Sequence, residues 1–205
     1  MAYPGPVTEP PRRPARARAA LRRGFELAGP YVLLWVDGVW PEGPVSGLAL
    51  ALAELPPALA LVVVADVWPP SQVPAPTLVG RTRRVLRPEL LTPHERWGLL
   101  AEAEIVLRVS GPADFDPVLT EGLRVGAPLV LADTPLAREL AGEDAILAAA
   151  DQAEAWARAL VELGTSTQRR EELARGARRR AERFAWLAHA RTTLAAYEAL
   201  HAGNL

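Results

Sequence analysis

The stretch from residue 105 to residue 133 constrains the fold of this chain more than any other part of it. Two short runs of Val, Leu and Ile flank a helix that the pattern predicts over residues 117–125. Asp116 is suited to cap that helix, Pro117 to its first position, and Gly126 to the left-handed position just past its end. Two apolar strands joined by a helix make a βαβ unit, so the strands should be parallel and buried on both faces.

The same order of elements occurs earlier in the chain. A strand at 31–36 and a strand at 61–65 flank a helix at 45–54. Repeated βαβ units predict the α/β class: a single Rossmann-like domain, with a parallel sheet, helices on both of its faces and a helical C-terminal extension. We expect this domain to span residues 31–205 and to follow a Pro- and Arg-rich leader or linker at 1–30.

Capping signals mark the start of several further helices. Thr92 and Glu95 have the spacing of a capping box, and Thr134 precedes a helix that opens with proline. We expect Asp151 to cap a helix over residues 152–163. These helices would cover the remaining strands of the sheet.

The composition excludes several kinds of chemistry. Half of the 205 residues are hydrophobic, which is enough for one sizeable core. The chain has no Cys, so neither disulfides nor Cys-ligated metals are expected, and its three His residues are too far apart in sequence to form a metal-spaced pair. All 23 basic residues are Arg, which removes Schiff-base and P-loop lysine chemistry.

Charge and hydropathy give expectations about partners and compartment. The net charge of −1 provides no strong attraction to nucleic acid or to an anionic membrane. Acidic residues interrupt the Arg-rich segment at 167–183, so we favour a solvated helix face over nucleic-acid binding. The longest apolar region, 48–64, is broken by Glu54 and two prolines, whereas a spanning helix needs ~20 mostly apolar residues. The first 30 residues contain no central apolar run, so we expect a cytoplasmic protein without a signal peptide.

Glu121 is the polar residue that stands out, because it falls in the middle of the helix predicted at 117–125. It either lies on a solvated face or belongs to a site. The segment 113–121, followed by Gly126-Ala-Pro-Leu-Val130, resembles the donor-binding signature of the family-4 glycosyltransferases of the GT-B fold. That signature is a Glu, seven residues, a second Glu, and then Gly-x-Pro-Val. The matching positions are Phe115, Glu121, Gly126 and Pro128.

The sequence departs from the family pattern at the residues that would hold a diphosphate. Ala113 stands in place of the first Glu, and Asp114 and Asp116 stand in place of two glycines. In the family, an arginine after the first strand and a lysine at the start of the first helix grip the donor diphosphate. In this sequence the corresponding positions look like Gly38 and the pair Glu42-Gly43, so both cations are absent. A diphosphate needs charge-assisted donors or helix N-terminal amides, and carboxylates beside it should repel it.

Four arginines near a short strand expected at 84–87 allow two interpretations. They could replace the missing phosphate-binding cations, or they could line an exposed edge of the sheet, which we favour. These residues are Arg81, Arg83, Arg84 and Arg87.

The resemblance implies a domain that binds a nucleotide sugar. Glu121 would hydrogen-bond the ribose hydroxyls, while Ser110 and the backbone amides of residues 116–119 would face the diphosphate. The implied binding residues are Gly38, Ser110, Phe115, Asp116, Pro117, Val118, Leu119 and Glu121. The resemblance implies no catalytic residue, metal or cofactor in this half of the enzyme; the ligand would be a nucleoside-diphosphate sugar.

Two functional interpretations follow, and a third is kept beside them. Family members have a first Rossmann-like domain with the acceptor pocket and the usual catalytic His, and this sequence resembles only the second domain. The first interpretation is therefore a donor-binding domain of a hexosyl-type glycosyltransferase, not catalytic alone, which needs an acceptor domain or another protein as partner. The alternative is a non-catalytic pseudo-glycosyltransferase that serves as a protein–protein interaction module, with homo-oligomers as one form of assembly. The third is an Arg-rich binder of nucleic acid or acidic surfaces.

Overall fold

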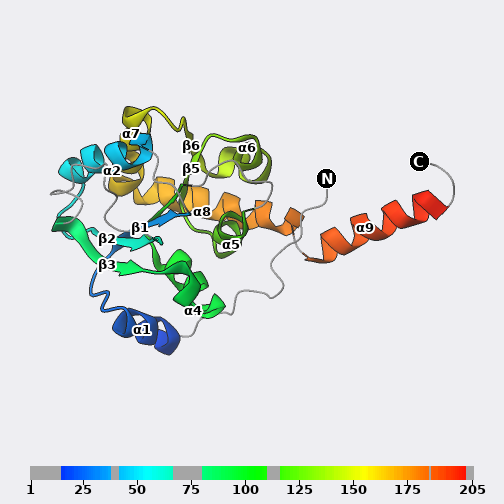
Figure 1. Cartoon of the computed structure of the whole chain (residues 1–205), viewed down its shortest axis with the longest axis horizontal. Coiled ribbons are helices and arrows are strands. Elements are labelled where there is room, and N and C mark those ends of the chain that lie inside the picture. Colours follow the sequence, from blue (N-terminus) through cyan, green and yellow to red (C-terminus); the bar gives the residue numbers. More distant parts are fainter. Residues whose placement is uncertain (1–14, 38–41, 67–79, 110–115, 185, 202–205) are drawn as a thin grey trace.

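A six-stranded, wholly parallel sheet forms the centre of the molecule, with strand order β3-β2-β1-β4-β5-β6 (Figure 1). The computed structural model describes residues 15–37, 42–66, 80–109, 116–184 and 186–201. The strands are β1 (Tyr31–Val36), β2 (Ala60–Val64), β3 (Thr82–Leu86), β4 (Ile105–Val109), β5 (Leu129–Ala132) and β6 (Ile146–Ala148). The predicted α/β class and Rossmann-like architecture are confirmed.

Helices cover both faces of this sheet. The α-helices are α1 (Ala15–Gly24), α2 (Glu42–Glu54), α4 (Pro93–Glu102), α5 (Pro117–Val125), α6 (Pro135–Leu140), α7 (Ala153–Thr165), α8 (Thr167–Ala181) and α9 (Trp186–His201). The described residues also form three 3-10 turns between these elements: η1 (Pro88–Leu90), η2 (Gly142–Asp144) and η3 (Glu182–Phe184). Helices α2 and α7 pack together over one face, and α4 and α5 lie over the other. Of the described helices, none combines the length and apolarity needed to cross a membrane.

The core has two halves because side chains alternate across the sheet. In β1, Leu34 points into the half that contains Trp156 of α7, whereas Leu33 and Trp35 point into the half that contains Leu99 of α4. All six side chains of β1 are buried. A parallel strand covered by helices on both faces has this continuous apolar pattern.

The predicted caps are confirmed with one exception. Thr92 and Glu95 form a complete capping box, the Thr134 side chain accepts from the Ala137 amide, and Gly126 adopts a φ of 73° after α5. The prediction for Asp151 is wrong: α7 begins at Ala153, one residue later than predicted, and its N-cap residue, Gln152, makes no side-chain capping bond. The chain first turns back through 149–152, with the Gln152 amide bonded to the Ala149 carbonyl, so Asp151 precedes the cap position.

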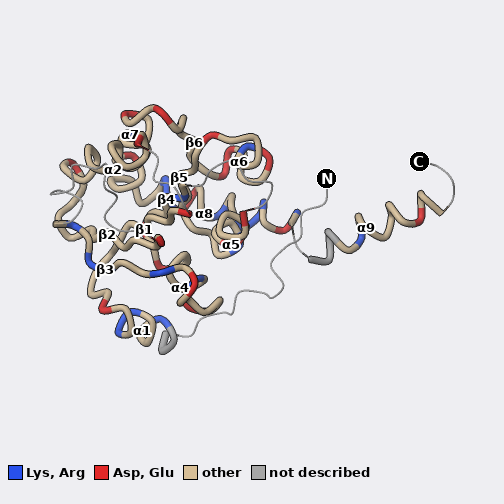
Figure 2. Tube along the Cα trace, viewed as in Figure 1, with Lys and Arg blue, Asp and Glu red and all other residues tan. Residues whose placement is uncertain are grey.

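Helix α8 carries both basic and acidic residues (Figure 2), and Arg175 and Arg179 are exposed, in agreement with the expected solvated face. Other arginines of α8 bind the C-terminal ends of neighbouring helices. Arg178 donates to the Val125 carbonyl at the end of α5, and Arg180 donates to the Leu140 carbonyl at the end of α6. Arg170 donates to a carbonyl in the last turn of α7. Arginines at helix C-termini satisfy free carbonyls and oppose the negative end of the helix dipole. Helix α8 therefore ties three helices to the domain.

The first and last helices differ in how they meet the domain. Helix α1, which lies within the expected leader, packs against α4, and Arg22 pairs with Glu102 at 3.3 Å. It ends with Glu26 in a left-handed conformation (φ 53°), where the amides of Glu26 and Leu27 bond back to the carbonyls of Arg23 and Arg22. This is a Schellman ending, which usually has glycine at that position. Helix α9 projects away from the sheet and its covering helices (Figure 1).

Candidate functional site

The strand order of the sheet reverses between β1 and β4. The chain runs outward from β1 through β2 to β3, and then returns to β4 on the other side of β1. In open α/β sheets, ligands bind beyond the carboxyl ends of the strands at such a switch point. Asp37 follows β1 there, and Asp116 opens α5 after β4. This edge is the first place to look for a site.

Buried polar side chains gather at the same place. In the described part of the chain, four polar or charged residues are buried: Arg108, Asp116, Thr120 and Glu121. All four belong to β4 or to α5 and its N-cap. Burial of charged groups costs free energy unless each is paired, so their concentration in one unit of the sheet marks a candidate site.

Arg108 is the central residue of this cluster. It lies near the end of β4 with only 3% of its surface exposed. Its Nε donates to Asp116 Oδ2 at 2.9 Å, its Nη1 donates to the Val109 carbonyl at 3.2 Å, and its Nη2 pairs with Asp37. The guanidinium thus joins the ends of β1 and β4 to the start of α5.

Sequence reasoning missed Arg108 because it was taken as part of an apolar strand. The available signal was a single charge inside a buried parallel strand. Two aspartates follow strands at the same edge of the sheet: Asp37 after β1 and Asp116 after β4. A buried arginine needs partners in reach, and the ends of adjacent parallel strands meet at one edge. The predicted site lacked a cation; the structure supplies one at the switch point.

Asp116 has two roles at the start of α5. Its Oδ1 accepts the Leu119 amide at 3.0 Å, which is the predicted capping bond, and its carboxylate also accepts from Arg108. Pairing with Arg108 inside the fold reduces the repulsion that we expected from Asp116. Pro117 has no N–H, and the Leu119 amide is already bonded to Asp116. Among these first-turn residues, the Val118 amide is therefore the donor that neither the proline nor the cap takes up.

Glu121 lies on α5 with 4% of its surface exposed, so its interpretation as part of a solvated face is wrong. Arg96 of α4 binds its carboxylate in a bidentate manner, with Nε to Oε2 and Nη2 to Oε1 both at 2.6 Å. This is the fork geometry of a strong charge-assisted pair. Each carboxylate oxygen keeps a further lone pair, and Arg96 remains partly exposed.

The other predicted site residues divide into three groups. Gly38, Ser110 and Phe115 lie outside the described residues. Glu42 begins α2 and is exposed. Among the four arginines of the β3 segment, Arg81 and Arg83 lie at the start of the strand, at the opposite edge from Asp116, and so do not replace the missing phosphate cations. Strand β3 is an edge strand, in agreement with the other interpretation.

A further acid lies at the carboxyl edge, beyond β5. Asp133 binds Arg138 of α6 through two hydrogen bonds of 2.6 and 2.7 Å. The hydrogen bond from Arg138, with a smaller Coulomb attraction, holds the pKa of Asp133 below its ordinary value of 3.8. Across the described ranges, no group of three Asp, Glu or His residues is arranged to hold a metal ion.

Comparison with solved structures identifies the class of fold. The Anabaena protein Alr3699/HepE in complex with UDP-glucose has a TM-score of 0.70 and 21% identity, over 91% of this chain and 54% of that one. Sucrose-phosphate synthase from Thermosynechococcus elongatus has a TM-score of 0.65 and 20% identity, over 98% of this chain and 50% of that one. The C-terminal domain of LpcC, a group 1 glycosyl transferase family protein from Francisella tularensis, has a TM-score of 0.65 and 13% identity, over 86% and 94%.

These likenesses show the fold of the C-terminal domain of GT-B glycosyltransferases. No protein-family model matches the chain, and no curated protein sequence matches it either. The chain spans about half the length of HepE and of sucrose-phosphate synthase, and nearly the whole of the isolated LpcC domain.

Proposed function

We propose that this chain is the donor-binding half of a glycosyltransferase-like protein and binds a nucleoside diphosphate or nucleotide sugar at the carboxyl edge of its sheet. The observation that carries the proposal is Glu121, a carboxylate buried in α5, the helix that begins at the switch point, and held in one orientation by Arg96. A fixed carboxylate with remaining lone pairs is suited to accept hydrogen bonds from the two hydroxyls of a ribose. The likeness to HepE, whose structure contains UDP-glucose, supports this proposal.

We further propose that the chain does not transfer a sugar alone. Transfer requires donor and acceptor to be positioned together, and the described residues make up one Rossmann-like domain. The acceptor-binding half would come from elsewhere in the same protein or from a partner chain. A cytoplasmic location remains our expectation from the sequence.

Isothermal titration with UDP, GDP and their sugar conjugates tests this function. Glu121→Gln keeps the shape of the side chain but weakens acceptance from ribose hydroxyls, and Glu154→Gln, an exposed position on α7, is the matched control. We expect saturable binding that Glu121→Gln weakens and the control leaves unchanged. Absence of binding to every nucleotide, by a folded protein, would reject the proposal.

A second candidate is a non-catalytic interaction module, and helix α9 specifically favours it. Leu194, Tyr197 and Leu200 recur every three residues and are each more than half exposed. A stripe of this kind on a helix that projects from the domain is suited to pack against another protein surface. Light scattering of wild type and a Leu194→Glu/Tyr197→Glu variant tests it: self-association or partner capture that the variant loses supports this role, and a monomeric, partner-free wild type argues against it.

A further inference from the structure

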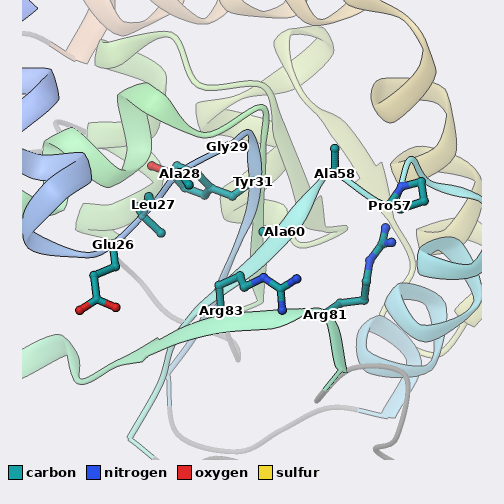
Figure 3. Close-up of a pocket in the computed structure, with 10 residues that line it drawn as sticks. All are labelled: Glu26, Leu27, Ala28, Gly29, Tyr31, Pro57, Ala58, Ala60, Arg81 and Arg83. Atoms are coloured by element: carbon teal, nitrogen blue, oxygen red, sulfur yellow. The ribbon is translucent and has the colours of Figure 1, made fainter.

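A cavity of about 320 Å³ opens at the amino edge of the sheet, opposite the edge that carries Arg108. Figure 3 shows three segments around it: the start of β3 with Arg81 and Arg83, the segment 26–29 that follows α1, and the segment 57–60 that leads into β2. The nucleotide site proposed above uses none of these residues. The arginines of β3, which the sequence singled out, therefore need an explanation of their own.

Two of these arginines are fixed by the ends of neighbouring helices. Arg81 donates through Nη2 to the carbonyls of Leu55 and Pro56, just past the end of α2, at 3.1 and 2.8 Å. Arg84 pairs with Glu26, just past the end of α1. Arg84 also donates through Nε to the Phe25 carbonyl at 2.8 Å, so both arginines bind carbonyls just past a helix end, where a cation opposes the negative end of the helix dipole. Arg81 still has an unused donor, because its Nε is buried and has no hydrogen-bond partner among the described residues.

Arg83 differs from both. Leu61 pairs with Thr82, and the next residue of β2, Val62, pairs with Arg84, so Arg83 is the extra residue of a β-bulge. A bulge re-aims a side chain away from the regular strand pattern. Arg83 is exposed and, within the described part of the chain, makes no hydrogen bond or ion pair. In Figure 3 its guanidinium points along β3 toward Arg81.

The balance of charge around the cavity is positive. Glu26 is the one carboxylate among the lining residues, and Arg84 already pairs with it. Arg83 is thus the lining cation without a described partner, and Arg81 lies beside it with one buried donor unpaired. The remaining wall includes the apolar Leu27 and Pro57. Guanidinium groups favour carboxylate and phosphate oxygens, and an apolar wall favours a hydrophobic body on the same ligand.

We propose that this cavity binds a small organic anion: a carboxylate or phosphate monoester with an apolar body. The anionic group lies beside the guanidinium groups of Arg83 and Arg81, and the apolar body lies against the apolar part of the lining. The volume suits a ligand of about one ring, at the lower end of the range for small-molecule pockets. This site is separate from the nucleotide site, so a negative result for one proposal leaves the other proposal unaffected.

An NMR titration of the whole chain tests the proposal, with phenyl phosphate, benzoate and inorganic phosphate as probes. We expect saturable shifts at the amides of Ala28, Gly29, Ala58 and Ala60, and tighter binding of the two aromatic probes than of inorganic phosphate. A comparison of phenyl phosphate with benzoate shows which anionic group the site prefers. Arg83→Gln should weaken binding about tenfold without lowering the melting temperature, because Arg83 has no described partner to lose.

Arg158→Gln is the matched control, since Arg158 is exposed on α7 and away from β3. It should leave both the affinity and the pattern of shifts unchanged. Equal losses in the two variants, or shifts spread over all arginine-rich surfaces, would show only non-specific attraction and overturn the proposal. The lack of any saturable shift would also overturn it and leave Arg83 as a residue that protects an edge strand.

Discussion

Arg96 and Glu121 join α4 to α5 through two parallel hydrogen bonds, each 2.6 Å long. The Glu121 side chain is almost fully buried, whereas the Arg96 side chain is 28% exposed. The pair therefore fixes the orientation of the acid that we propose for ribose binding. It also makes that acid dependent on a residue of another helix.

Arg96→Met should destabilise the chain by about 2–4 kcal/mol, because it leaves the carboxylate of Glu121 buried without its partner. Urea denaturation followed by circular dichroism measures this change. Arg169→Met is the control: its partners, Glu162 and Glu172, are exposed, so its cost should stay below about 1 kcal/mol. Equal costs for the two variants would contradict the buried-pair interpretation.

Asp116→Ala should cost about 3–5 kcal/mol, since it removes the cap of α5 and leaves Arg108 buried with one fewer acid. Asp116→Asn should cost less, because an amide oxygen still accepts the Leu119 N–H. Denaturant melts of both variants give the order. An alanine variant as stable as the asparagine variant would show that the capping bond contributes little.

Asp116→Asn also carries a prediction about binding. It removes a negative charge from the start of α5 and leaves Arg108 less completely neutralised. The affinity for UDP should therefore rise relative to that for uridine, which lacks the phosphates. Titration of both ligands into both proteins measures the ratio. A ratio that does not change would mean that the diphosphate of a bound nucleotide does not approach Arg108.

The βαβ unit around α5 could be predicted from the sequence because its signals are local. Asp116, Pro117 and Gly126 each have a conformational preference that depends on near neighbours, and the helix has the predicted bounds. The prediction that Asp151 caps α7 was wrong because it, too, relied on local residue types. A tight turn precedes α7, and an Asp is suited both to such a turn and to a cap.

The pairs within the candidate site could not be predicted, since they depend on how elements pack. Arg96 and Glu121 are 25 residues apart, and their contact depends on how α4 lies beside α5. Arg108 reaches Asp37 because β1 and β4 are neighbours in the sheet although β2 and β3 separate them in the chain. Residue types alone indicate that a buried charge needs a partner, not which partner it has.

Arg138→Gln should raise the pKa of Asp133 toward its ordinary value of 3.8 and make stability less dependent on pH. In the wild type, the lowered pKa favours the ionised acid in the folded state. The resulting stabilisation is present above the ordinary pKa and is lost as the pH falls through the lowered value. NMR titration of the Asp133 carboxyl, with melting temperatures at about pH 6 and about pH 2, checks both effects.

The two proteins should differ most in melting temperature near neutral pH and converge in acid. Asp133→Asn should behave in the same way, because it removes the other partner of the pair. A difference between wild type and Arg138→Gln that grows as the pH falls would contradict this sign.

Gly47→Ala should destabilise the chain by about 1–3 kcal/mol through overpacking between α2 and α7. A Cβ atom at Gly47 would collide with the Ala153 carbonyl and come within 2.5 Å of Trp156 Cβ, and backbone atoms cannot move aside as the end of a flexible side chain can. Gly24→Ala is the control, because a Cβ there would meet nothing within 4 Å and alanine favours the helix by up to about 1 kcal/mol. Thermal melts should therefore shift in opposite directions for the two variants. A Gly47→Ala protein as stable as wild type would show that α2 and α7 separate without cost, and would argue against the close packing that holds α2 beside the carboxyl edge.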